Sequence, residues 1–212
     1  SAEVVILMTV LRALQQIDGK DRRVVELEHH GRSVDEIDLT RTIGWFTSLY
    51  PLEVELTGFP IEEQLLNLKE LLNGAEENRL DFGVLQLNEN NKTEIYPDVR
   101  LNYLGKFGDE LNNDLFTFVQ KDTGLDVGIE NKATAKLEIN CMIVEHEFNM
   151  QIVTSASNFS KEKIAKLEKC IENQIDEIIG SIVRDDNEGK FTPSDFELSD
   201  IEQDDLDQLF ME

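Results

Sequence analysis

The sequence predicts an α/β fold of the layered α+β type, in which helices at both ends of the chain flank a mixed central sheet. Apolar residues recur at helical spacing from Val4 to Leu14, and again from Ile164 to Ile182. Short segments rich in aromatic and β-branched residues lie between these helices and predict strands. At 212 residues the chain has the length of one domain, which buries roughly 70% of its unfolded surface.

The first predicted helix ends at Gly19, because glycine favours helix termination. Its apolar residues occupy most of the circumference, so we expect burial on more than one side. Apolar and charged residues alternate over 24–28, which predicts a strand, and a polar loop follows at 31–42. The aromatic and β-branched run at 45–56 predicts a second strand, which Pro51 places at a sheet edge or a bend.

The middle of the chain predicts one helix followed by strands. Leucines recur at helical spacing between Pro60, which suits a helix start, and Gly74, which suits a helix end. Residues 82–87 and 99–104 predict two strands, separated by an asparagine-rich turn at 88–92.

Further strands are predicted at 116–119, 137–144 and 148–154, and the last two form a hairpin whose turn contains His146. Ser160 is a favourable N-cap for the long C-terminal helix. The chain therefore predicts a β-rich centre enclosed by helices.

We divide the chain into a main domain, residues 1–190, and a C-terminal segment, residues 191–212. The segment begins extended, and Ser199 with Glu202 then forms a capping box that predicts a short acidic helix. Neither internal repeats nor low-complexity tracts are present.

The chain is strongly acidic, with 44 Asp and Glu against 20 Lys and Arg and a formal net charge of -24. Such a charge repels phosphate backbones and anionic membranes, so we expect neither nucleic acid nor a membrane surface as a partner. Acidity of this kind most often serves solubility, with an acidic docking surface as the alternative.

The two cysteines, Cys141 and Cys170, fit no metal-ligand spacing and are expected to be buried free thiols in a reducing cytoplasm. The apolar start of the chain is short and Arg12 interrupts it, so it predicts a core helix rather than a signal peptide or membrane span. We expect a cytoplasmic protein with no bound metal.

Glu28 is a candidate proton acceptor, because it ends a predicted strand beside two histidines and Arg32. Removal of an α-proton from a thioester needs a base within hydrogen-bond reach, an acid on the opposite face and donors for the enolate-like oxygen. The alternative is an ordinary surface glutamate that pairs with Arg32.

Three segments together resemble one family: Glu28-His29-His30-Gly31-Arg32, the run from Arg41 through Gly44-Trp45-Phe46-Thr47 to Tyr50-Pro51, and Leu101-Asn102-Tyr103-Leu104-Gly105-Lys106. Their order and spacing resemble the C-terminal half of the epimerization domain of nonribosomal peptide synthetases, which belongs to the condensation-domain superfamily. This resemblance implies a chloramphenicol-acetyltransferase-like half-fold. It also implies an isomerase activity, L-to-D inversion at the α-carbon of an aminoacyl or peptidyl thioester.

The resemblance assigns roles to seven residues. It implies that Glu28 is a catalytic acid/base and that Asn102 and Tyr103 take part in catalysis. We expect Glu28 and Tyr103 to line a common groove. The resemblance also implies substrate contacts for four residues, namely His30, Arg32, Trp45 and Thr47. The sequence departs from the family pattern at His29, where glycine is usual, and at Ser33, where a second glutamate is usual.

The resemblance further implies that the substrate is carried on the phosphopantetheine arm of a peptidyl carrier protein domain, with no cofactor bound directly. The family's His-His-x-x-x-Asp motif belongs to an N-terminal half that is not in this sequence, so that half is an expected partner. We expect the isolated chain to be inactive and to self-associate through an apolar face, with the first helix as the place of exposure. The alternatives are the second half of a condensation domain, which forms peptide bonds, and a noncatalytic module that binds a carrier protein.

Overall fold

The computed structural model describes residues 1–32, 37–56, 58–76, 78–87, 95–107, 124, 128, 130–144 and 146–184. Within these residues the chain divides into two compact units. One contains the helices α1 (Ala2–Asp18), α2 (Ile61–Glu76) and α4 (Lys161–Arg184). The other contains the sheet and the short helix α3 (Asp81–Leu87).

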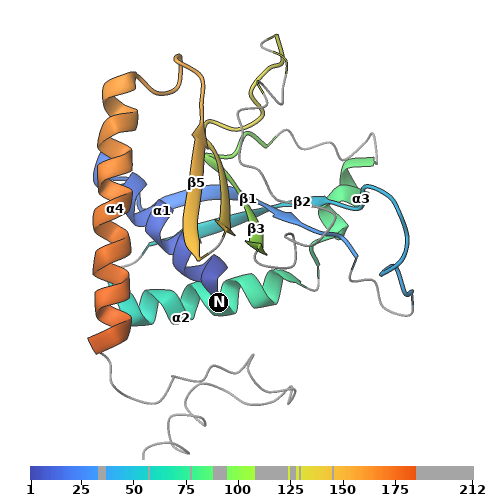
Figure 1. Ribbon diagram of the computed structural model, residues 1–212, viewed down its shortest axis with the longest axis horizontal. Helices are drawn as coiled ribbons and strands as arrows, with labels where there is room; N and C mark the ends of the chain where they lie inside the picture. Colours follow the sequence, from blue (N-terminus) through green and yellow to red (C-terminus); the bar gives the residue numbers. More distant parts are fainter. Residues whose placement is uncertain are drawn as a thin grey trace, which may run out of the picture. The chain divides into compact units, whose positions relative to one another are not determined.

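In the helical unit, α1 packs against both α4 and α2 (Figure 1). Gly19 ends α1 in the left-handed conformation, with a φ of 72°, and its amide donates to the carbonyl of Gln15. Nearly every apolar side chain of α1 is buried, and those exposed by 1% or less are Leu7, Met8, Val10, Leu11 and Ala13. The predicted burial on more than one side is therefore confirmed, whereas the expectation that α1 exposes apolar surface is wrong.

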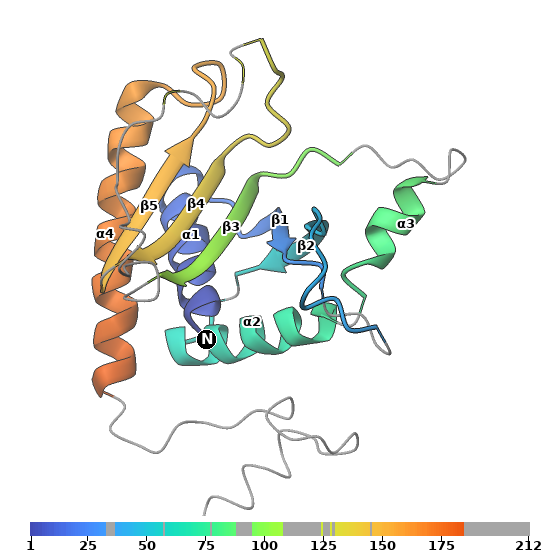
Figure 2. The ribbon, with the colours of Figure 1, turned by 45° about the vertical axis from the view of Figure 1, so that its right-hand side comes forward.

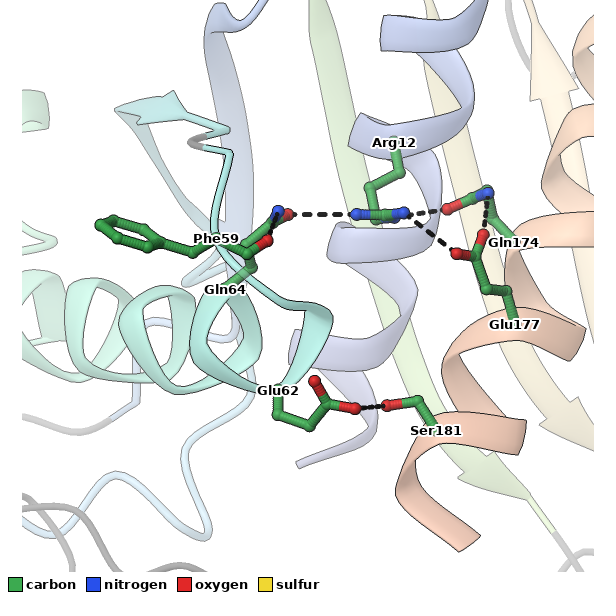
Figure 3. Close-up of polar contacts among 7 residues, drawn as sticks. All are labelled: Arg12, Phe59, Glu62, Gln64, Gln174, Glu177 and Ser181. Atoms are coloured by element: carbon green, nitrogen blue, oxygen red, sulfur yellow. Dashed lines mark hydrogen bonds and ion pairs between the residues drawn. The ribbon is translucent and has the colours of Figure 1, made fainter. Parts of the chain in front are cut away.

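Arg12 of α1 joins the three helices through polar contacts (Figure 3). Its Nε donates to Oε1 of Gln174 on α4 at 2.5 Å, and its terminal nitrogens lie 3.4 Å from Gln64 of α2 and 3.4 Å from Glu177 of α4. The Gln174 amide nitrogen in turn donates to Glu177 at 2.7 Å. Because Gln174 is only 2% exposed, this contact satisfies an oxygen that water does not reach.

The sheet has five strands in the order β2-β1-β3-β4-β5 (Figure 2). Strand β3 is parallel to both β1 and β4, whereas β4 and β5 are antiparallel. The predicted mixed sheet is thus confirmed, and so is the hairpin, in which His146 has a positive φ of 71°. The strand bounds are β1 (Arg22–His29), β2 (Ser48–Glu55), β3 (Val99–Phe107), β4 (Glu138–Val144) and β5 (Glu147–Val153).

Side chains alternate between a buried apolar face and a polar face across the three central strands. The register pairs Val25 with Val99 and Leu27 with Leu101, all four of them buried. Cys141 is also fully buried, and burial raises the pKa of its thiol to about 12. Cys170 is buried and free as well, as expected.

Three predicted element bounds are wrong. Residues 82–87 form the helix α3 rather than a strand, and none of its side chains is buried. Strand β2 begins at Ser48, so residues 45–47 lie outside it, although Pro51 does lie in an edge strand as predicted. Strand β3 continues to Phe107 through a shift in register, where Gly105 has a φ of 91°.

Some expectations lie outside the described residues, namely the turn at 88–92, the strand at 116–119, Ser33 and the segment 191–212 with its capping box. Within the described part of the chain, none of the helices combines the length and the apolar character that crossing a bilayer requires.

Candidate functional site

Glu28 lies at the penultimate position of β1 and is half-buried. Alternation along the strand places it on the same face as Glu26, opposite to the buried Val25 and Leu27. The charged neighbours that act on Glu28 are Arg100 of β3, Glu26 of β1 and Glu138 of β4. One arginine and three carboxylates therefore meet on the polar face of the central strands.

Arg100 is the centre of this cluster. Its Nε lies 2.5 Å from Oε2 of Glu26, and its Nη2 contacts the same oxygen. Its Nη1 lies 3.7 Å from Oε1 of Glu138. Glu26 is only 7% exposed, and its register partner in β3 is Arg100 itself. The guanidinium is thus committed to Glu26 through a charge-assisted contact, so the nearby Glu28 is neutralised only in part.

The pKa of Glu28 is raised above its ordinary value of 4.5. Burial is the largest cause, because the charged form loses hydration. The positive charge of Arg100 opposes the rise in pKa, whereas the negative charges of Glu26 and Glu138 add to it. A carboxyl group whose pKa moves toward neutrality is better suited to both taking up and returning a proton.

Asn102 is a sequence-predicted residue that lies on the same face of the sheet as Glu28. The register pairs Glu26 with Arg100 and Leu27 with Leu101, and alternation along the two strands then gives Glu28 and Asn102 the same face. Asn102 is half-buried, and its partner on the other side is Asn140 of β4. The side chain carries both an amide donor and a carbonyl acceptor.

Tyr103 does not share this face. It follows Asn102 in a regularly paired part of β3, opposite the fully buried Cys141, so its side chain points to the apolar side of the sheet. The expectation that Glu28 and Tyr103 line a common groove is therefore wrong. The two residues lie on neighbouring strands, and a one-residue difference in phase places their side chains on opposite faces.

The segment after Glu28 turns sharply. The amides of Gly31 and Arg32 donate to Nδ1 of His29 and of His30 respectively, both at 3.0 Å, and the two imidazole rings lie 3.9 Å apart. Gly31 has a φ of 65°. His30 is exposed, and its Nδ1 is engaged with the backbone rather than directed at Glu28.

Arg32 binds the loop that follows it. Its guanidinium donates to the carbonyl oxygens of Leu39 and Thr42, both at 2.7 Å, and of Gly44 at 3.2 Å. Its central carbon also lies 4.5 Å from the centroid of the Phe46 ring. The residues that the resemblance assigned to substrate contacts thus include one, Arg32, that already donates to three backbone carbonyls.

Trp45 and Thr47 are both exposed. Trp45 is 90% exposed and its neighbour Ile43 is 100% exposed, values that are high for large apolar side chains. The structure therefore presents Trp45 outward from the loop. The residue type alone favours burial, so this exposure differs from what tryptophan usually shows.

Sequence reasoning gave no site role to three charged residues of this region, Glu26, Arg100 and Glu138, nor to Phe46, which lies in one of the matched segments. The signal for the first three is the alternation of charged and apolar residues in their strands, which becomes informative only once the strand register is known. Among the described residues, no cluster of three or more His, Cys, Asp or Glu side chains is arranged to hold a metal ion.

Comparisons with known proteins give a consistent family. The model of the family described as "Condensation domain" matches residues 2–198. Bacitracin synthase 2 of Bacillus licheniformis is 25% identical over 98% of this chain, and surfactin synthase subunit 2 of Bacillus subtilis is 29% identical over 88%. The chain spans only 8% and 5% of the lengths of these two relatives.

Among solved structures, the epimerization domain from the third module of tyrocidine synthetase B superposes with a TM-score of 0.75. It is 25% identical, and the match covers 87% of this chain and 43% of that one. A condensation domain that mediates chain release from the enacyloxin polyketide synthase has a TM-score of 0.60 at 11% identity, which shows a shared fold.

Proposed function

This chain belongs to the condensation domain family, and within it we propose that the chain forms part of an epimerization site. The proposed reaction is L-to-D inversion at the α-carbon of an aminoacyl or peptidyl thioester. The observation that carries the proposal is Glu28, a half-buried carboxyl group of raised pKa at the end of a central strand. The similarity to the tyrocidine epimerization domain supports the same choice.

Inversion requires one group to remove the α-proton and another to return a proton on the opposite face. Glu28 fits the first role, because its carboxylate can accept the α-proton from one face while another group supplies a proton to the opposite face. Asn102, in phase with Glu28 on the next strand, fits the stabilisation of the enolate-like oxygen through its amide. The opposing acid comes from outside the described residues in this proposal.

The proposal retains a peptidyl carrier protein domain as the partner that delivers substrate on its phosphopantetheine arm. It also retains the need for the complementary half of the domain, because the match covers 43% of the solved epimerization domain. No metal or diffusible cofactor enters the proposed reaction. The chain alone is then expected to give no inversion.

The experiment is a deuterium exchange assay in heavy water. A carrier protein loaded with an L-aminoacyl thioester is mixed with this chain and with the portion of the tyrocidine epimerization domain that the chain does not match. Mass spectrometry measures α-deuterium uptake, and chiral chromatography measures the D-isomer. We expect both signals from the complete mixture and neither when one protein component is omitted.

The variant Glu28→Gln tests the assigned base, and Glu26→Gln is the matched control on the same face of the same strand. We expect Glu28→Gln to lower α-deuterium uptake at least about a hundredfold, the usual scale for loss of a general base. Uptake that persists in Glu28→Gln contradicts the assignment. An equal loss in both variants, with the fold retained, indicates that the whole charged cluster matters rather than Glu28.

A second function, peptide-bond formation, is supported by the match of the condensation domain model to residues 2–198. The same mixture distinguishes it when two carrier proteins are supplied, one with a donor and one with an acceptor amino acid. A dipeptide without α-deuterium uptake favours condensation. Carrier binding with neither product favours a noncatalytic carrier-binding module.

A further inference from the structure

The loop between β1 and β2 is held by contacts between one arginine side chain and the loop backbone. Arg32 alone donates to three backbone carbonyl oxygens, of Leu39, Thr42 and Gly44, and stacks on Phe46. Those carbonyls span residues 39 to 44, so one side chain fixes most of the described loop. Within the loop, the Thr42 amide donates to Leu39 at 3.1 Å.

The two ends of the loop also meet closely. An added Cβ at Gly31 would lie 1.6 Å from the carbonyl oxygen of Phe46, so the backbone at these two positions is in direct contact. An added Cβ at Gly44 would lie 2.9 Å from the ring of Phe46. Phe46 thus packs against Gly31, Arg32 and Gly44, which closes the loop onto the end of the strand that carries Glu28.

We infer that Arg32 is a positioning residue, which holds residues 37–46 in one conformation and so keeps Trp45 and Ile43 presented outward beside the end of β1. This role differs from the substrate contact that the sequence resemblance implies. Three of the five N–H donors of Arg32 bind backbone carbonyls and one face of the guanidinium covers an aromatic ring, so most of this side chain is already engaged within the chain. The effect of Arg32 therefore exists before any substrate binds.

Lysine is the informative replacement. It keeps the positive charge that a phosphate or carboxylate ligand would need, but its single ammonium group cannot reproduce the planar fork or the stacking on Phe46. If Arg32 only binds a ligand, replacing it with lysine leaves the conformation of the loop unchanged in the free chain. If Arg32 positions the loop, the same replacement loosens the loop in the free chain.

The chain offers a direct readout, because Trp45 is its only tryptophan. Fluorescence excited at the indole band therefore reports on this loop alone. We expect Arg32→Lys to lower the fluorescence anisotropy of Trp45 and to speed exchange of the Thr42 amide hydrogen by about tenfold. The Cys141 amide, in a central strand, is the internal reference and is expected to keep its exchange rate.

Arg41→Lys is the matched control, since Arg41 is an exposed arginine in the same loop. Phe46→Leu is the second test, because it removes the stacking partner but keeps Arg32, and we expect about a threefold increase in Thr42 exchange. The inference is overturned if Arg32→Lys and Phe46→Leu leave the exchange rate of the Thr42 amide unchanged. It is overturned as well if Arg41→Lys speeds this exchange as much as Arg32→Lys does. It is also overturned if Cys141 exchange rises in parallel, because Arg32 then supports the sheet as a whole. Every measurement is made without substrate, so the result is independent of the proposed reaction.

Discussion

At the scale of single residues, the polar face of the sheet combines two carboxylates with different roles. Glu26 is buried and paired with Arg100, whereas Glu28 is two residues further along, half-buried, and shares the same arginine only through space. Burial is the largest cause of the raised pKa of Glu28, and Arg100, which pairs with Glu26, offsets it only in part. The raised pKa makes Glu28 suitable for proton transfer and predicts a dependence of stability on pH.

We predict that Glu28→Gln raises the melting temperature at pH 7. The pKa of Glu28 is raised in the folded state, so the stability that its neutral form contributes is fully present below its ordinary value of 4.5 and is lost as the pH rises through the higher folded value. The variant removes this loss. The melting temperature difference between variant and parent is therefore expected to vanish at about pH 4 and below.

Thermal unfolding measured across this pH range provides the check. Glu172→Gln, at an exposed position on α4, controls for the removal of one negative charge from a chain of net charge -24. A melting temperature for Glu28→Gln that is lower than that of the parent at pH 7 would show that the contact with Arg100 outweighs desolvation.

The glycine that follows the histidine pair gives a second prediction. Gly31→Ala combines a left-handed backbone with a clash against the Phe46 carbonyl, and we expect it to lower the free energy of unfolding by about 3 kcal/mol or more. Gly105→Ala is the matched control, because its φ is also positive but its added Cβ meets nothing within 4 Å. We expect that control to cost about 1–2 kcal/mol in urea unfolding. Equal losses in the two variants would mean that the close contact with Phe46 contributes nothing.

At the scale of helices and strands, hydrophobic periodicity predicted those elements whose apolar faces are buried. The helices α1 and α4 and the strands β1, β3 and β4 were found within a few residues. Strand β5, which has no buried residue, was predicted as the second strand of a hairpin. Helix α3 was missed, because residues 82–87 alternate in a strand-like way while none of its side chains is buried. Without burial to select one period, the apolar pattern of this segment does not distinguish a helix from a strand.

The candidate site could be predicted only in part for the same reason. Glu28 and Asn102 were identified from local motifs, but their shared face depends on the parallel register of β1 and β3, which no short motif encodes. Tyr103 was misplaced because its neighbour in sequence points to the other face. Strand β2 begins later than predicted, and the residues before it are held in the loop by Arg32, which binds the Gly44 carbonyl and the Phe46 ring. Arg32 lies more than ten residues earlier in the sequence, so the local pattern at 45–47 does not reveal this contact.

The junction of the three helices gives the prediction at this scale. Arg12→Met leaves the buried Gln174 oxygen without its donor, and we expect a loss of about 1–3 kcal/mol in the free energy of unfolding. Adding Gln174→Leu removes the unsatisfied oxygen, so the double variant is expected to lose less than the sum of the two single losses. Urea unfolding of all four proteins completes the cycle. Strictly additive losses would show that Arg12 and Gln174 are not energetically coupled.

At the scale of the whole molecule, two opposing features act on association. The formal net charge of -24 repels a second copy, whereas several large apolar side chains outside α1 are exposed. In the unit that contains the sheet, the side chains exposed by more than half are Ile37, Ile43, Trp45, Val84, Leu85 and Leu87. We therefore expect self-association to use exposed apolar side chains outside α1, such as those of the loop after β1 and of α3.

We predict that self-association depends on salt. At low ionic strength the negative charge keeps copies apart, while at about 0.5 M salt the screening length falls to a few Å and apolar contacts act without this opposition. Sedimentation velocity is expected to show monomer in the first condition and larger species in the second. Because Trp45 is the only tryptophan and is 90% exposed, a shift of its emission to shorter wavelength would show that the loop is buried on association. Trp45→Ser is expected to reduce the fraction of larger species, and Leu87→Ser is the matched variant on α3. A chain that stays monomeric at high concentration in high salt contradicts the prediction.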